Sequence, residues 1–382
     1  MKILILHGYS NQYGFDSIRL TKWIERLNGY GFYVDDYVCP LAIKGMRMPW
    51  HKLNYTWQSS DRILIEFYEK LANKCNEYDV LINFGAINLH PNFLEQLSII
   101  KVLVFRDDPE STKYFSEPVA LFHDICAIGN IAEINKYKSW GHKYVTWLPN
   151  GFWEDDFDSN LKIDELFSIE RDVDVSILCE RLTQYRKRNL DKFTKAFPKG
   201  EYYGKGWPNG FLPEMDRVKL IQRSKIGINI HNSTGPINFR TFYLPANGVL
   251  QICDNKSYLG KIFELDKEVI GYNNIEEAIE KTNYYLNNET ERLKIARAGF
   301  IRTMKDYNEK ECFNRIIEAV NLFKLDHIKQ AEKSHLVTIS NSKKNKIEVL
   351  FKFIRMLAED LRFKTDNFVK HKLPRLFGKY LK

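Results

Sequence analysis

The sequence predicts two consecutive α/β domains, each with a doubly wound parallel sheet, and a basic helical tail behind them. Short apolar runs alternate with helical patterns along residues 1–150, and the same alternation restarts after an acidic, irregular stretch at 152–158. Apolar runs that alternate with helices are typical of parallel strands covered on both faces. The alternation stops near Lys324, and 382 residues are too many for one ordinary core. We therefore expect domains at 1–150 and 151–325 and a tail at 326–382.

Each half has its own series of expected elements. In the first half we expect strands at 2–6, 32–39, 80–84, 101–105, 125–128 and 144–148, and helices at 16–29, 57–77 and 130–138. In the second half we expect strands at 173–178, 201–203, 226–230, 249–253 and 268–270, and helices at 187–197, 214–223, 239–246, 274–287, 289–304 and 308–323. Open α/β sheets bind ligands at the carboxyl ends of their strands, so both halves should face a cleft between them.

The tail carries the excess charge of the chain. Residues 343–382 contain 12 Lys or Arg and 4 Asp or Glu, which leaves 45 of each sign for the body. A helix over 346–370 would align one apolar stripe with basic residues around it. Three interpretations remain open: the helix packs on the body, lies on an anionic membrane surface, or packs against a second subunit. The neutral body weakens a nucleic-acid function.

The cysteines and the apolar runs indicate a cytoplasmic protein. The six cysteines are scattered singly, without a C-x2-C pair, so we expect buried thiols and neither a disulfide framework nor a zinc site. No apolar run approaches the roughly 20 residues of a membrane span. We expect a cytoplasmic location, with the tail as the feature that would hold the protein at the inner face of a membrane.

Polar residues follow two strands of the first half. Gly8 comes after the first strand, beside His7, and lets the backbone approach a ligand; a plain tight turn explains it equally well. Asp107 and Asp108 follow the fourth strand, where a carboxylate could take a proton from an acceptor hydroxyl. Alternatively, Asp108 caps the next helix and Arg106 pairs with Asp107. Our candidate catalytic residues are Asp107, Asp108 and His7.

A glycine-rich loop follows the second strand of the second half. Lys205 lies between two glycines, Gly204 and Gly206, and Trp207 comes next. Such a loop can approach a diphosphate, with the lysine as a point charge and the aromatic ring stacked on a base. A simple glycine turn is the alternative.

The most informative run extends from residue 229 to residue 250. A strand ends in small polar residues, a helix begins near Asn238, and Gly248 ends it before another buried strand. Hydroxyls, backbone N–H groups and Arg240 converge there, as a sugar-nucleotide diphosphate requires. Arg240 as a structural arginine paired across the sheet is the alternative. From this run we expect donor contacts by His231, Ser233, Thr234, Asn238, Arg240 and Thr241.

The second half resembles a known family. The run Asn238-x-Arg240-Thr241-Phe242-x-x-Pro245-Ala246-x-Gly248, followed by Asp254 and Leu259, resembles the spore maturation protein CgeB-like branch of group-1 glycosyltransferases. Weaker matches extend the resemblance over about residues 100–320. It implies the GT-B fold, a nucleotide-sugar donor held by the second half, an acceptor held by the first, and no metal or other cofactor. The donor contacts that it implies are Gly204, Lys205, Trp207, Asn238, Arg240, Thr241 and Gly248.

One position departs from the family pattern. Tyr243 stands where many group-1 enzymes have a ribose-binding glutamate, and Gly235 replaces its paired glutamate. Ribose is bound differently, the donor is unusual, or activity has been lost, and we expect the first. Tyr243 and Gly8 are also among the expected donor contacts. We expect a metal-independent glycosyltransferase acting on a glycan, lipid-linked or protein acceptor in bacterial surface glycan or glycoconjugate assembly. A nucleotide-sugar epimerase or hydrolase, or a non-catalytic glycan- or nucleotide-binding protein, is the alternative.

Overall fold

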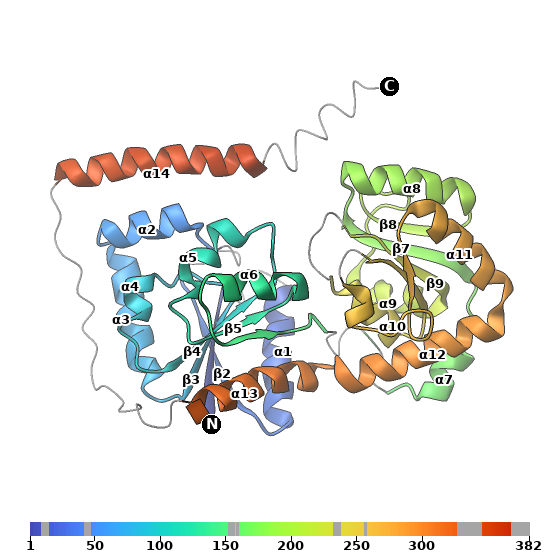
Figure 1. Cartoon of the computed structure of the whole chain (residues 1–382), viewed down its shortest axis with the longest axis horizontal. Helices are drawn as coiled ribbons and strands as arrows, with labels where there is room; N and C mark the ends of the chain where they lie inside the picture. The colour runs from blue at the N-terminus through green and yellow to red at the C-terminus, as the bar shows by residue number, and fades with distance from the viewer. Residues whose placement is uncertain are drawn as a thin grey trace. The chain divides into compact units, whose positions relative to one another are not determined.

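The computed structural model divides the chain into two compact units (Figure 1). It describes residues 1–8, 15–41, 47–151, 157, 160–231, 238–255, 258–326 and 346–367. Unit 1 contains Met1–Leu148 and the described residues from Phe313 onward, whereas unit 2 contains Pro149–Cys312. Helix α13 (Glu309–Asp326) spans the boundary between them. Each unit is described below by itself.

Unit 1 contains a parallel sheet of six strands. All the strands predicted for the first half are present, in the spatial order β2-β1-β3-β4-β5-β6. In register, Ile3 of β1 lies beside Val34 of β2 and Val80 of β3. The strands are β1 (Lys2–His7), β2 (Tyr33–Val38), β3 (Val80–Phe84), β4 (Ile100–Phe105), β5 (Ile125–Ile128) and β6 (Val145–Trp147).

The helices of unit 1 differ from the prediction at a break near Ser60 and by two short helices, at 91–94 and 117–120, that were not predicted. The single helix expected at 57–77 is two helices, because Ser60 has a positive φ of 54° and the Asp61 side chain caps a new helix by accepting from the Leu64 N–H at 2.9 Å. The helices are α1 (Phe15–Gly29), α2 (Trp50–Gln58), α3 (Arg62–Cys75), α4 (Pro91–Leu94), α5 (Glu117–Ala120), α6 (Ile134–Ser139) and α14 (Lys346–Asn367).

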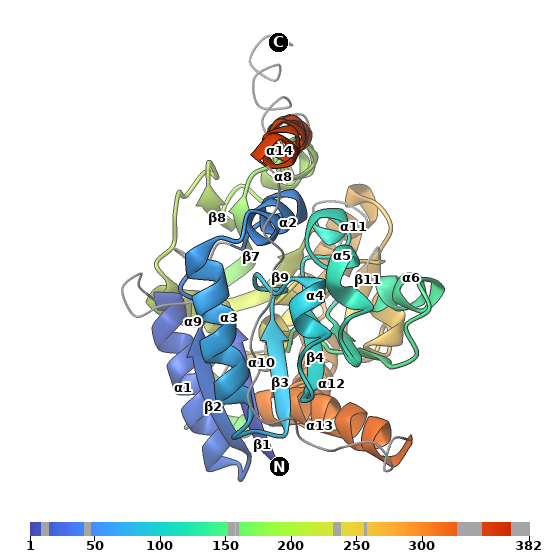
Figure 2. The same ribbon diagram turned by 90° about the vertical axis from the view of Figure 1, so that its left-hand side faces the viewer.

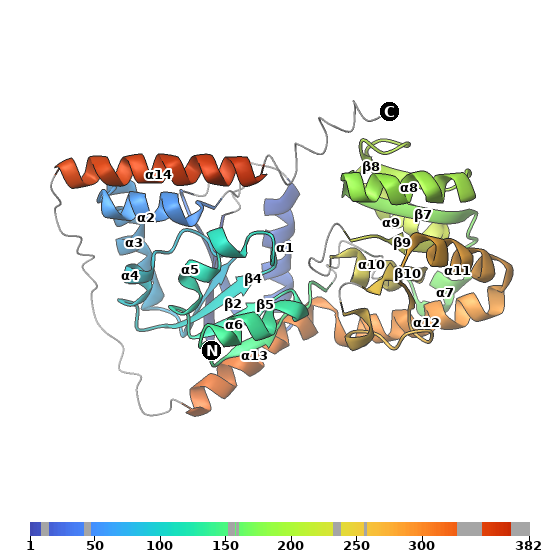
Figure 3. The ribbon, with the colours of Figure 1, turned by 45° about the horizontal axis from the view of Figure 1, so that its top comes forward.

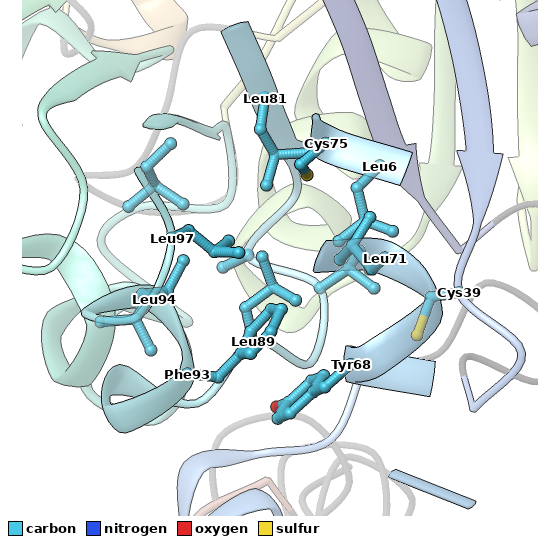
Figure 4. Packing of buried hydrophobic residues seen from close by; sticks show 14 of the residues in the cluster. Leu6, Cys39, Tyr68, Leu71, Cys75, Leu81, Leu89, Phe93, Leu94 and Leu97 are labelled. Atoms are coloured by element: carbon cyan, nitrogen blue, oxygen red, sulfur yellow. The ribbon is translucent and has the colours of Figure 1, made fainter. Parts of the chain in front are cut away.

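The core of unit 1 fills both sides of its sheet. Leucines of β1 and β3 meet Tyr68 and Leu71 of α3 and Phe93 of α4 on one face (Figure 4). Helices α3 and α4 lie in front of the strands in Figure 2. The Tyr68 hydroxyl donates to the Asn88 carbonyl at 2.8 Å, so this buried polar group is paired. On the other face, Trp23 of α1 contacts Phe313 of α13, with ring centroids 6.0 Å apart.

Unit 2 contains a parallel sheet of five strands in the order β11-β10-β9-β7-β8. The last strand lies at 270–272, slightly beyond the 268–270 predicted, and α7 was not predicted. The strands are β7 (Val173–Arg181), β8 (Glu201–Lys205), β9 (Ser224–Asn229), β10 (Leu250–Asp254) and β11 (Ile270–Tyr272). The helices are α7 (Ile163–Ser168), α8 (Gln184–Ala196), α9 (Glu214–Arg223), α10 (Arg240–Ala246), α11 (Ile275–Asn287) and α12 (Glu289–Asp306).

Both units place their first strand between their second and third strands. In unit 1 the strand order reverses between β1 and β3, and in unit 2 it reverses between β7 and β9. In open parallel sheets, ligands bind beside such a switch point, at the carboxyl ends of the strands. The fold therefore predicts one site at each of these two edges.

The described part of the tail is a helix that packs on unit 1. Helix α14 lies along α2 in Figures 1 and 3, and the two helices are in contact. The buried Asp360 carboxylate lies 3.2 Å from His51 Nε2 and 3.3 Å from Lys52 Nζ. Phe353 meets Tyr55, with ring centroids 5.5 Å apart. Of the three interpretations of the tail, packing on the body therefore holds for residues 346–367.

Two expectations from composition concern the whole chain. All six cysteines are buried free thiols, as predicted. Among the described helices, none combines the length and the apolar character that a membrane crossing requires.

Candidate functional site

A buried polar network lies at the carboxyl end of β9. The side chain of Asn229, the last residue of this strand, is fully buried. Its Nδ2 donates to Thr241 Oγ1 and Gln251 Oε1, both at 3.2 Å, and its Oδ1 accepts from Asn238 Nδ2 at 3.0 Å and from Arg240 Nε at 3.1 Å. Because one amide side chain joins all four partners, the beginning of α10 is fixed against the sheet.

Two arginines converge just beyond this network. Arg186 Nε donates to the Ile230 carbonyl at 3.1 Å, and Arg240 Nη2 lies 3.4 Å from the same oxygen. Arg186 is only 6% exposed. Burial lowers the pKa of its guanidinium, and the neighbouring Arg240 charge lowers that pKa too, while Asp254 counteracts. Two cations thus stand near one carboxylate, and such a surplus of positive charge attracts an anion.

His231 and Asp254 form a buried pair beside the arginines. Asp254 Oδ1 lies 2.7 Å from His231 Nδ1, and Asp254 Oδ2 accepts from the His231 backbone N–H at 2.7 Å. Within the described part of the chain, His231 Nε2 has no hydrogen-bond partner although it is buried. Cys253 completes a cluster whose ligand atoms lie within 4.8 Å of one another, which is a spacing compatible with a metal ion.

The glycine loop after β8 is a tightly packed turn. A Cβ on Gly204 would lie 1.7 Å from the Cys179 carbonyl oxygen, and Gly204 has a φ of +154°. The Gly204 N–H donates to the Gly210 carbonyl at 2.7 Å, so this donor is used within the loop. Lys205 is exposed, whereas Trp207 is 4% exposed in the core of unit 2. The turn explains the glycines, and the buried Trp207 ring offers no open face to a base.

Gly248 and Tyr243 are two further donor candidates, and Tyr243 interacts electrostatically with Arg240. Gly248 has a φ of +68° and its N–H donates to the Pro245 carbonyl at 2.9 Å, so it ends helix α10 before β10 begins. It is therefore at the opposite edge of the sheet from His231. Tyr243 is buried at 5% exposure, and Arg217 lies 5.3 Å above its ring. The candidates Ser233 and Thr234 lie outside the described residues.

In unit 1 the candidate His7 forms a pair with an acidic residue of the next strand. His7 Nε2 lies 2.9 Å from Asp36 Oδ2, with the histidine buried and the carboxylate half exposed. The hydrogen bond to His7 lowers the pKa of Asp36, although partial burial opposes this effect. Gly8 follows directly and is buried. A histidine held by a carboxylate at the end of β1 is suited to exchange a proton with a ligand there.

The two candidate aspartates of unit 1 have different environments. Asp107 is exposed, and its described ion pair, at 2.5 Å, is with Arg47 rather than with Arg106. Asp108 is fully buried, accepting from the Thr112 hydroxyl and from the Tyr137 hydroxyl at 2.9 Å. Burial raises the pKa of Asp108 to about 6, although these hydrogen bonds oppose the shift. Its oxygens are used within unit 1, which supports a structural role for Asp108.

Four polar residues of this site were not among the predicted site residues: Asn229, Arg186, Gln251 and Asp254. A signal existed for three of them, because Asn229 and Gln251 are polar residues inside otherwise apolar strand runs and Asp254 follows the run that carries the family resemblance. Such residues are buried only when hydrogen-bonded, so they indicate a network. The structure brings His231, Asn238, Arg240 and Thr241 together with this set.

Comparisons with known proteins agree with this architecture. The fold is similar to those of Anabaena HepE, solved with UDP-glucose (14% identity, TM-score 0.54, covering 84% of this chain and 100% of HepE), and of sucrose-phosphate synthase from Thermosynechococcus elongatus (10%, 0.58, 85% and 100%). It is also similar to an alpha-glucosyltransferase solved with UDP and a DNA 13-mer containing an HMU base (12%, 0.56, 84% and 99%). At such identities the likeness shows the fold alone, which is the two-domain GT-B fold.

The family match is confined to one region of the chain. Residues 177–318 match the family model described as glycosyl transferase-like. This region contains the arginines, the His231–Asp254 pair and the Asn229 network. Within the GT-B fold, this region is therefore similar to glycosyltransferases. No curated protein matches the chain in sequence.

Proposed function

We propose that this protein is a glycosyltransferase that moves a sugar from a nucleotide-sugar donor to a hydroxyl acceptor in bacterial surface glycan or glycoconjugate assembly. The observation that carries the proposal is the convergence of Arg186 and Arg240 on the Ile230 carbonyl. Both arginines lie within the segment that matches the glycosyl transferase-like family. We also infer membership of the CgeB-like branch from the run that begins at Asn238.

The donor diphosphate is proposed to bind at the carboxyl edge of unit 2. Arg186 and Arg240 supply fixed positive charge, and the exposed Lys205 supplies a mobile one. Such cations stabilise the departing diphosphate without a metal ion, so we propose metal-independent transfer. UDP is the first nucleotide to test, because HepE and the alpha-glucosyltransferase were solved with UDP-containing ligands.

The acceptor is proposed to bind unit 1. His7, held by Asp36, and the exposed Asp107 are the groups that can take the acceptor proton. Asp108 is less suited, because its oxygens are buried and hydrogen-bonded.

The exposed side of α14 supports a membrane-bound location, and hence a lipid-linked acceptor. Ile354, Leu357 and Leu361 are 55%, 48% and 67% exposed and lie on one helical stripe, with exposed Arg355 and Arg362 beside them. Such a surface suits an anionic bilayer at the inner face of the membrane. Cosedimentation with phosphatidylglycerol vesicles tests this: binding should fall in a Leu357→Ser/Leu361→Ser variant. Equal binding by both proteins would contradict it.

A thermal-shift screen of UDP-, GDP-, dTDP- and CMP-sugars tests the function. A donor at about 100 times its dissociation constant stabilises the folded protein by roughly 2.7 kcal/mol. One nucleotide class should shift the wild type in the presence of EDTA and should not shift Arg240→Ala. Sugar release or transfer from that donor then distinguishes an enzyme from a binding protein. If none of the four classes shifts the wild type, the proposed function is wrong.

A further inference from the structure

The pair formed by His231 and Asp254 has an unusual division of contacts. Both carboxylate oxygens of Asp254 are engaged by His231, one at the backbone N–H and one at Nδ1, each at 2.7 Å. The two side chains are almost completely buried, at 2% and 3% exposure. Because one oxygen holds the main chain and the other holds the ring, Asp254 fixes both the position and the rotation of the imidazole.

This orientation leaves one ring nitrogen without a partner. The carboxylate can only accept at Nδ1, so Nδ1 carries a proton and Nε2 is the remaining polar atom of the ring. Nε2 has no partner among the described residues, although it is buried. Buried polar atoms are nearly always hydrogen-bonded, and leaving one unsatisfied is costly. A nitrogen fixed in this way is explained by a ligand atom that completes its hydrogen bonding.

The surrounding charges indicate the chemistry of that ligand. Arg186 and Arg240 both approach the carbonyl of Ile230, the residue that precedes His231. One buried carboxylate therefore faces two guanidinium groups, and a negatively charged ligand restores the balance. We propose that His231 Nε2, protonated in the complex, donates a hydrogen bond to a phosphate oxygen of a nucleoside diphosphate, and that Asp254 is the positioning residue that aims the ring. This inference rests on the proposed function and assigns a specific role in it to each of the two residues.

A metal ion is the competing occupant of the same cluster. Cys253, His231 and Asp254 have suitable spacing. However, burial raises the pKa of the Cys253 thiol well above its usual range, which disfavours the thiolate that a metal needs. Both Asp254 oxygens already accept hydrogen bonds from His231. The hydrogen bonds of the pair therefore favour a phosphate over a metal ion.

Calorimetric titration of the full chain with UDP and with uridine tests the proposal. The variants are His231→Gln, which removes the ring, and Asp254→Asn, which weakens its orientation. The matched control is His142→Gln, at a buried histidine of unit 1 whose Nε2 donates to the His123 carbonyl at 3.0 Å. Both site variants should lose about tenfold or more of the UDP affinity, because each weakens a hydrogen bond to a charged group. Their affinity for uridine should be unchanged. The control should bind UDP as the wild type does.

Other outcomes separate the two proposals. If the wild type binds UDP and both site variants bind it equally well, the role of the pair is wrong and the proposed function stands. If EDTA abolishes UDP binding and the purified protein contains stoichiometric metal, the cluster is a metal site, which also overturns the inference. If the wild type binds no nucleoside diphosphate, both proposals fail. Should the variants not fold, histidine NMR of the wild type decides: UDP should shift at least one of the nine histidines, and no shift contradicts the proposal.

Discussion

The two units have the same strand order around their switch points, yet they differ in the charges that stand there. At the β1/β3 edge of unit 1, His7 pairs with Asp36, and Arg47 pairs with Asp107 while donating to the Gly85 carbonyl at 2.8 Å. These described pairs match one basic group with one acidic group. The carboxylates of the two pairs are 47% and 60% exposed to water.

At the β7/β9 edge of unit 2, the charges are buried and unequal. Arg186 and Arg240 face Asp254, and the Asn229 side chain holds Arg240 in place. Under the proposed function, one topology serves two kinds of ligand, because the side chains at the strand ends decide what binds. The unequal edge suits an anionic donor, and the balanced edge with its histidine suits a neutral hydroxyl acceptor.

Removing one arginine from each edge should have the largest effect. Arg186→Met leaves the Asn229 network intact and should lower UDP affinity about a thousandfold, because a buried charged contact to the ligand is lost. Arg47→Met removes the arginine that pairs with Asp107 in unit 1. Its UDP affinity, measured by calorimetry, should stay within about twofold of the wild-type value. Comparable losses in both variants would show that the two edges do not divide the ligands as proposed.

Most of the fold could be predicted from the sequence because buried parallel strands are continuous apolar runs. All eleven strand segments were expected within a few residues. Helices of only four to six residues, such as α4 (Pro91–Leu94) and α7 (Ile163–Ser168), were missed because they are too short to show a helical period. The break at Ser60 was also missed, since no glycine or proline marks it.

The site could be predicted only where its residues are neighbours in the sequence. His231, Asn238 and Arg240 lie in one run, and the structure brings them together. Arg186 meets the same carbonyl from 44 residues away, a contact that only the sheet creates. Gly248 was included by motif position, yet its φ of +68° shows a helix-ending glycine at the other edge. A motif therefore mixes residues that bind with residues that shape the chain.

A second prediction tests whether the glycine loop after β8 is a structural turn or a ligand-binding loop. Gly204→Ala should lower the free energy of unfolding by about 3 kcal/mol or more, because its Cβ would lie 1.7 Å from the Cys179 carbonyl oxygen. Gly210→Ala in the same loop is the control: φ is +73° but nothing lies within 4 Å of the added Cβ, so about 1 kcal/mol is expected. Urea unfolding measures both. A stable Gly204→Ala protein with weakened nucleotide binding would instead make Gly204 a ligand contact.

The smallest expected effect concerns the buried carboxylate of unit 1. Burial raises the pKa of Asp108 from 3.8 to about 6, so the folded state binds this proton more tightly than the unfolded state. Its contribution to stability is therefore complete below about pH 4 and is lost as the pH rises through 6, a change on the order of 2 kcal/mol. Asp108→Asn cannot ionise, so its stability relative to the wild type should rise between pH 4.5 and pH 7 in urea unfolding.

The neighbouring Asp107→Asn is the matched control, because water already reaches that carboxylate in the folded protein. It should show no comparable rise. If Asp108→Asn keeps donor and acceptor turnover while changing this pH dependence, Asp108 acts on the stability of unit 1, and the proton acceptor must be sought at His7 or Asp107. If turnover is lost while the pH dependence of unfolding is unchanged, the buried carboxylate takes part in the reaction. The acceptor site of unit 1 then includes Asp108 as well as His7 and Asp107.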